Sequence, residues 1–89
     1  MLTLSEISRE MSTLNSWSLT GTSISKNYEF TNFKEALDFV NKVGEIAEKQ
    51  QHHPDILINY SQVRLSITTH SEGGLTKKDF DLARGIDSL

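Results

Sequence analysis

The first third of the chain changes from helical to strand spacing of its apolar residues. Apolar residues recur at steps of three or four, as one face of an amphipathic helix requires, at Leu4, Ile7, Met11 and Leu14. Thr3, with Glu6 three residues later, fits a capping box at the start of this helix. From Trp17 to Phe30 apolar and polar residues then alternate on both sides of Gly21. A short helix followed by a β-hairpin is therefore predicted.

The middle of the chain predicts a long helix and a second hairpin. Helical spacing runs from about Asn32 to Gln51. Pro54 ends the helix, because proline disfavours helical geometry at the preceding residue and cannot donate the next hydrogen bond. Two runs of period two follow on either side of Ser61-Gln62, and their apolar members are Ile56, Ile58, Tyr60, Val63, Leu65 and Ile67. These runs are typical of two strands joined by a tight turn.

The last part of the chain predicts a loop and a third helix. Residues 71–74 contain Gly73-Gly74, which favours a tight turn. Thr76, with Asp79 three residues later, opens a helix that runs through Ile86. The element order is then α-β-β-α-β-β-α. Because each strand has an apolar and a largely polar face, we predict an α+β two-layer sandwich, a four-stranded antiparallel sheet with the helices on one face.

The apolar pattern also predicts which side chains pack in the core. Lys26 falls on the apolar side of its strand, where we expect its stem along the core edge and its ammonium in water. Trp17 and Tyr60 are expected in the core. So is the apolar stripe of the long helix, which consists of Phe33, Leu37, Val40 and Ala47.

Composition limits the size and surroundings of the protein. With 89 residues, 36% of them hydrophobic, the chain has room for one domain, residues 1–89, with a modest core. We therefore expect the chain to self-associate. The chain has no cysteine, so it offers neither disulfides nor thiolate metal sites, and a reduced cytoplasm is the expected location.

Charge and hydropathy argue against two classes of partner. The formal net charge is -3 and the basic residues are scattered, whereas nucleic-acid binding needs clustered lysine and arginine. No stretch approaches the ~20 apolar residues of a membrane span, and the first residues do not resemble a secretory signal. We expect neither a nucleic-acid nor a membrane partner.

The second hairpin is predicted to bring two histidines together. If Ser61-Gln62 is the turn, Tyr60 pairs with Val63 and the ladder continues to His53 opposite His70. Directly opposite residues have Cβ atoms about 5 Å apart. A longer turn, or a distortion at Pro54, would break this register.

All three histidines of the chain would then lie in one place, beside Glu48, which precedes His52 by one helical turn. Imidazole titrates near neutral pH, so His52, His53 and His70 could form an acid/base site. Asp79 could approach from the other side of the loop. The structural alternatives are a histidine that ends the helix and a histidine at a strand end. We expect no metal, because adjacent histidines point in different directions and the H-x-x-x-H spacing is absent.

Seven of these positions resemble the signature of the pterin-4a-carbinolamine dehydratases: Glu48, His52, His53, Pro54, Tyr60, His70 and Asp79. The similarity extends more loosely over nearly the whole chain. It implies the sandwich fold predicted above, assembly as a homodimer or homotetramer, no cofactor, and dehydration of 4a-hydroxytetrahydropterin to quinonoid dihydropterin. By position, His52, His53 and His70 would be catalytic.

The same resemblance implies that Glu48 and Asp79 orient an imidazole or bind the pterin, and Thr69 is a weaker candidate for substrate contact. Lys78 stands where some relatives have arginine, which alters the expected contacts at the substrate edge. Two alternatives stay open. One is an interaction module, because some animal members of the family also act as dimerisation cofactors of a transcription factor. The other is a role toward a different pterin, such as one linked to molybdenum-cofactor metabolism.

Overall fold

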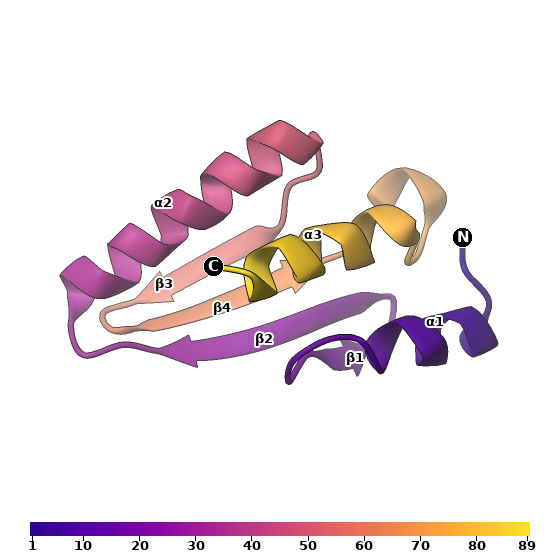
Figure 1. The fold of residues 1–89 in the computed structure, drawn as a ribbon, viewed down its shortest axis with the longest axis horizontal. Helices are drawn as coiled ribbons and strands as arrows, with labels where there is room; N and C mark the ends of the chain where they lie inside the picture. Colours follow the sequence, from indigo (N-terminus) through magenta and orange to yellow (C-terminus); the bar gives the residue numbers. More distant parts are fainter.

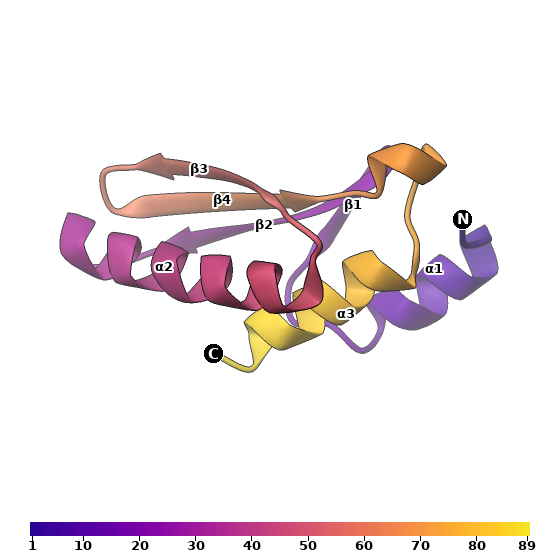
Figure 2. The same ribbon diagram turned by 90° about the horizontal axis from the view of Figure 1, so that it is seen from above.

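Three helices lie on one face of a four-stranded antiparallel sheet in the computed structural model, which describes residues 1–89 (Figures 1 and 2). The predicted fold class and element order are confirmed. A short 3-10 helix, η1, also follows the last strand. In chain order the elements are α1 Leu4–Met11, β1 Ser18–Thr20, β2 Ser23–Glu29, α2 Phe33–Gln50, β3 Asp55–Asn59, β4 Gln62–Ile67, η1 His70–Glu72 and α3 Lys77–Asp87.

The helices begin where the sequence places their capping residues. The backbone N–H of Glu6 donates to Oγ1 of Thr3 at 3.2 Å, and the N–H of Thr3 donates to the Glu6 carboxylate at 2.9 Å. Asn32 caps α2 by accepting from the N–H of Glu35 at 2.9 Å. Gln51 ends α2 in a left-handed conformation, with φ +53°.

The core lies between the sheet and the helices, but α2 is rotated relative to the prediction. Ala36, Val43 and Ala47 are its buried residues. Phe33 and Leu37, predicted in the stripe, are instead 46% and 40% exposed. The physical reason is that small alanine side chains let the helix pack close to the sheet, which turns the bulkier side chains outward. The buried hydrophobic residues are Trp17, Ile24, Ala36, Val43, Ala47, Val63, Leu65, Ile67, Leu75, Phe80, Leu82, Ala83 and Ile86.

Lys26 differs from its prediction. Its ammonium does not end in water but lies 3.3 Å from Oδ1 of Asp87, with the side chain only 16% exposed. It also lies 5.0 Å from the ring centroid of Tyr28. An acidic residue at the end of α3 therefore neutralises a lysine on the core side of β2, which local alternation could not indicate.

The register of the second hairpin also differs from its prediction. The sheet order is β1-β2-β4-β3. Tyr60 takes a left-handed φ of +53°, so the turn is Tyr60-Ser61, and Asn59 pairs with Gln62. Relative to the prediction the partner of every β3 residue is shifted by two. Because side chains alternate with period two, this shift keeps the same residues facing the core, and the alternation could not reveal it.

Two further predictions fail because of this turn. The ladder between β3 and β4 ends where Asp55 pairs with Ser66, so His53 and His70 are not opposite each other. Tyr60, expected in the core, is 68% exposed because it lies in the turn.

Candidate active site

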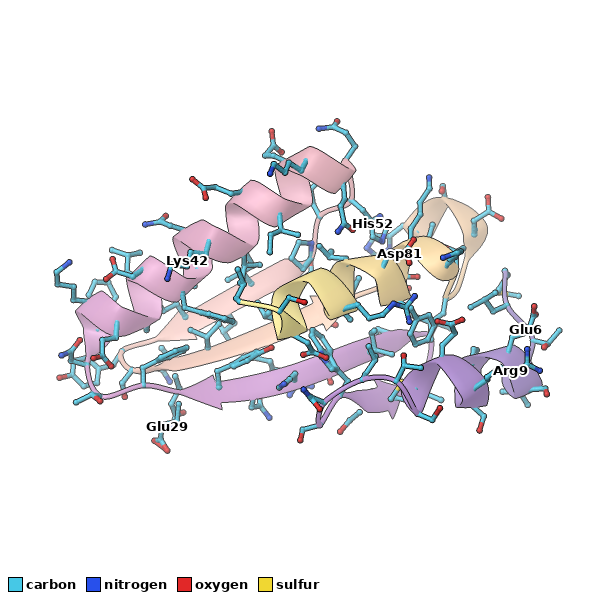
Figure 3. All side chains as sticks on the ribbon, in the orientation of Figure 1. Glu6, Arg9, Glu29, Lys42, His52 and Asp81 are labelled. Carbon is cyan, nitrogen blue, oxygen red and sulfur yellow. The ribbon has the colours of Figure 1, made fainter.

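The end of α2 and the start of α3 bring a histidine to a buried carboxylate. Figure 3 shows His52, just after α2, directed toward α3 near Asp81. The two helices approach closely at Gly85, where an added Cβ would lie 3.1 Å from Nε2 of Gln50. Nε2 of His52 lies 2.6 Å from Oδ1 of Asp79. The His52 side chain is 12% exposed and the Asp79 side chain is fully buried.

Asp79 is held from its other side by two threonines, one before and one after η1. Its Oδ2 accepts from the hydroxyl of Thr69 at 2.8 Å and from the backbone N–H of Thr76 at 2.8 Å. In both of these contacts the carboxylate is the acceptor. An ionised carboxylate only accepts hydrogen bonds, so Nε2–H of His52 is the donor in the remaining contact.

His53 pairs with a different carboxylate. Its Nε2 contacts Oε2 of Glu48, and both side chains are exposed. The sequence predicted Glu48 on the same side as His52, but Gln51 turns the backbone into a left-handed conformation before either histidine. Helical spacing therefore does not continue to His52, and Glu48 meets His53 instead.

His70 is the first residue of η1 and is exposed. The turn closes through Gly73, which has φ +70° and donates its N–H to the carbonyl of His70 at 3.1 Å. Thr69 and Gly74 form an isolated antiparallel bridge across the same loop. The tight turn predicted from the two glycines is confirmed. Through Thr69, this loop is connected to the Asp79 carboxylate that also binds His52.

Two adjoining hollows lie beside these residues. One, of about 420 Å³, is lined by Gln50, His52, Lys78 and Asp81, and its size falls in the range of small-molecule sites. The other, of about 270 Å³, is lined by Thr69, Ser71, Glu72, Thr76, Lys77 and Lys78. Lys78 lines both hollows. Gln50 and Asp81 were not singled out from the sequence, because their place beside His52 depends on how α2 packs against α3.

Asp81 gives the first hollow a fixed negative charge. Partial burial raises the pKa of this carboxyl, but hydrogen bonds from Arg84 at 2.9 Å and Lys77 at 3.2 Å outweigh it, so the pKa lies below its ordinary value. Lys78 contributes a positive charge to the same hollow. A molecule bound in this hollow would therefore meet the His52 imidazole together with the negative charge of Asp81 and the positive charge of Lys78.

The structure contains neither a cluster of metal-binding side chains nor a helix suited to a membrane. No group of three or more histidine, cysteine, aspartate or glutamate side chains is arranged to hold a metal ion. None of the helices combines the length and the apolar character that a membrane crossing requires.

Comparisons with known proteins point to one family. The family model described as pterin 4 alpha carbinolamine dehydratase matches residues 1–89. A relative from Picosynechococcus sp. is 50% identical over 88 residues, which cover 99% of this chain and 96% of that protein. A relative from Sulfurisphaera tokodaii is 47% identical, with coverage of 99% and 95%. Both names give pterin-4-alpha-carbinolamine dehydratase as an activity still to be established.

Two solved structures share the fold. The crystal structure of a transcriptional coactivator/pterin dehydratase from Brucella melitensis superposes with a TM-score of 0.92 at 31% identity, and covers 98% of this chain and 95% of that chain. A pterin dehydratase-like protein described as a RuBisCO assembly factor in the alpha-carboxysome superposes with a TM-score of 0.70 at 18% identity, with coverage of 83% and 88%. The second likeness concerns the fold alone.

Proposed function

Because the chain belongs to the pterin 4 alpha carbinolamine dehydratase family, we propose that it removes water from 4a-hydroxytetrahydropterin to give the quinonoid dihydropterin. Residues 1–89 would act as one catalytic domain. The reaction breaks the bond between C4a and the hydroxyl oxygen and forms a double bond from C4a to the ring nitrogen. The hydroxyl leaves as water, and the ring nitrogen gives up its proton, so no electrons are exchanged with a cofactor.

The proposed chemistry needs one acid and one base. A general acid protonates the departing hydroxyl, and a general base accepts the proton of the ring nitrogen. His52, His53 and His70 are the candidates, because imidazole exchanges protons near neutral pH. His52 and His53 are each bonded to a carboxylate, Asp79 and Glu48 respectively, which orients the ring.

One observation carries the proposal. His52 lines an open hollow while its Nε2 is bonded to a fully buried carboxylate. A histidine that only ended a helix would not need such a partner. Histidine and buried aspartate next to an accessible hollow are the arrangement expected of a general acid/base.

The direct test measures decay of the 4a-hydroxypterin intermediate with purified protein and without added metal. We expect a rate clearly above that in buffer. His70→Ala and His52→Gln should each lower the rate by roughly 10²- to 10⁴-fold. Glutamine at position 52 can still donate an N–H toward Asp79, so that variant removes the titratable ring without removing that donor.

A control variant separates catalysis from general damage. Lys34→Ala changes an exposed residue of α2, and its rate should equal that of the wild type. Circular dichroism checks that each variant is folded. A folded wild-type protein that leaves the decay at the buffer rate would remove the dehydratase proposal.

An interaction module is the second candidate function. Leu57 is 62% exposed on the sheet face away from the helices, beside a hollow of about 470 Å³. Exposed apolar side chains on such a face suit protein contacts, and the similar Brucella protein is named as a coactivator as well as a dehydratase. If interaction is the main role, His70→Ala should complement a strain lacking the protein while Leu57→Asp should not.

The expected homodimer or homotetramer, the cytoplasmic location and the pterin partner belong to the same proposal. The support for self-association is a core of 13 buried hydrophobic residues together with several large apolar side chains that stay exposed. Burying those side chains against a second copy would enlarge a small core.

A further inference from the structure

The Asp79 carboxylate is closed to a ligand, because it is buried and both of its oxygens have partners. It is fully buried, its Oδ1 faces Nε2 of His52 at 2.6 Å, and its Oδ2 takes two donors at 2.8 Å, from Thr69 and Thr76. All these partners belong to the chain itself. A carboxylate in this state acts on a bound molecule only through another residue.

Each hydrogen bond around Asp79 is donated toward its carboxylate. Oγ1 of Thr69, only 5% exposed as a residue, lies 2.8 Å from Asp79 Oδ2 and 2.8 Å from Oγ1 of Thr76. A hydroxyl has one proton, and the ionised carboxylate can only accept. Thr69 therefore donates to Asp79 and accepts from the hydroxyl of Thr76. The chain of donors runs from Thr76 to Thr69 to Asp79, and His52 donates to the same carboxylate from the opposite side.

This direction fixes which ring nitrogen of His52 is available. With Nε2–H committed to Asp79, the other ring nitrogen, Nδ1, remains for a molecule in the hollow that His52 lines. We propose that Thr69 and Asp79 are positioning residues, which hold His52 so that it exchanges its proton with the substrate through Nδ1. This inference rests on the proposed dehydratase function and says which residues of its site position His52 and which atom of His52 exchanges the proton. Substrate contacts then fall to other residues that line the hollows.

The first test needs no substrate. In Asp79→Asn the amide oxygen must face the two donors, Thr69 hydroxyl and Thr76 N–H, so the amide NH₂ points at His52. Nε2 of His52 must then accept, and its proton moves to Nδ1. Nitrogen-15 NMR of the histidine rings in the ligand-free protein should show Nε2–H for His52 in the wild type and Nδ1–H in Asp79→Asn. His53 should keep its wild-type signals and serves as the internal control.

The second test separates positioning from substrate contact. Thr69→Val removes the hydroxyl at nearly constant volume and should lower kcat by about 10-fold with KM within about twofold, as partners one step removed from the reacting group do. Thr69→Ser keeps the hydroxyl and should restore the rate. Thr68→Val is the matched control, because the Thr68 hydroxyl donates to the carbonyl of Thr22 at 2.6 Å, away from Asp79.

Two results would overturn the inference. One is an unchanged Nε2–H tautomer of His52 in Asp79→Asn, and the other is a Thr69→Val variant that raises KM while kcat stays constant. The NMR result does not depend on turnover. If the wild type fails to dehydrate the pterin but the tautomer switches as expected, the dehydratase function falls and the assigned hydrogen-bond direction stands.

Discussion

The hydroxyl of Tyr28 is buried without a hydrogen-bond partner, although its ring is only half buried. The ring packs against Phe39, with ring centroids 4.5 Å apart, and under the ammonium of Lys26. A buried hydroxyl that loses its water without gaining a partner destabilises the folded state. Apart from this hydroxyl, Tyr28 functions as an aromatic core residue, which is a role that phenylalanine fills.

Tyr28→Phe should therefore raise the free energy of unfolding, by about 1 kcal/mol. The measurement is urea denaturation at neutral pH with the linear extrapolation. Tyr60→Phe is the control, because Tyr60 is 68% exposed and its hydroxyl is solvated, so we expect no change there. A loss of stability in Tyr28→Phe would show that the hydroxyl has a partner in solution.

Tyr28 should also make the stability of the protein depend on pH in the alkaline range. Burial and the negative charge of Asp87 raise the pKa of Tyr28 well above its ordinary value. The folded state therefore keeps a proton that the unfolded state releases above about pH 10. By linkage, the stability that depends on the neutral form of Tyr28 is intact below about pH 10. It is lost as the pH rises toward the folded-state pKa. Wild type and Tyr60→Phe should lose stability more steeply from pH 10 to 11 than Tyr28→Phe does.

At the scale of elements, one turn residue sets the register of the second hairpin. Tyr60 has a left-handed backbone, with φ +53°, and stands between the last β3 residue and Ser61. That conformation is strained for an aromatic residue, and more so for a β-branched one, whereas asparagine tolerates it. The site is affected as well, because the hairpin ladder stops at Asp55 and leaves His53 free to meet Glu48.

We expect Tyr60→Asn to be more stable than Tyr60→Val by about 1 to 2 kcal/mol. Both variants lose the ring, so the difference between them reports the backbone conformation alone. Thermal and urea unfolding of the two variants measure it. Equal stabilities would mean that the turn is not left-handed at this position.

The hydrogen bonds of the site also depend on the turns that connect its elements. The Gly73 turn returns the chain to α3, so that Thr69 and Thr76 meet the same carboxylate. The left-handed Gln51 ends the helical path before both His52 and His53, which then meet different carboxylates, Asp79 and Glu48. The placement of the candidate histidines therefore depends on two short turns more than on the helices next to them.

At the scale of the whole molecule, Asp87 joins three distant segments. Its carboxylate accepts from Nε1 of Trp17 at 2.9 Å, from the N–H of Asn15 at 3.0 Å and from Lys26 at 3.3 Å. The side chain is 11% exposed and that of Lys26 16%. These bonds tie the end of α3 to β2 and to the loop after α1. Because the hydrophobic core is small, we expect this cluster to contribute substantially to the free energy of unfolding.

Asp87→Ala should lower the free energy of unfolding by about 3 kcal/mol, since it leaves the buried ammonium of Lys26 unpaired. Asp38→Ala is the matched control, because its pair with Lys34 is 57% and 84% exposed and should contribute less than about 0.5 kcal/mol. Both are measured by urea unfolding at neutral pH. A loss in Asp87→Ala no larger than that of the control would contradict a structural role for the cluster.

The sequence by itself determined the elements and their order, because periods of 3.6 and 2 are local properties that each segment carries. Capping residues such as Thr3 and Thr76 indicated helix starts for the same reason. The histidines could be singled out as candidates because their chemistry belongs to the residue type.

Only the tertiary structure decided which partners those residues have. A register shift of two preserves every alternation, so the pairing of β3 with β4 depended on the backbone at Tyr60. The bond from His52 to Asp79 spans 27 residues and that from Lys26 to Asp87 spans 61, and both arise from the packing of α3. Such contacts are set by the whole chain packing together. The sequence placed Asp79 near the histidines without indicating which imidazole it meets, and it placed the ammonium of Lys26 in water.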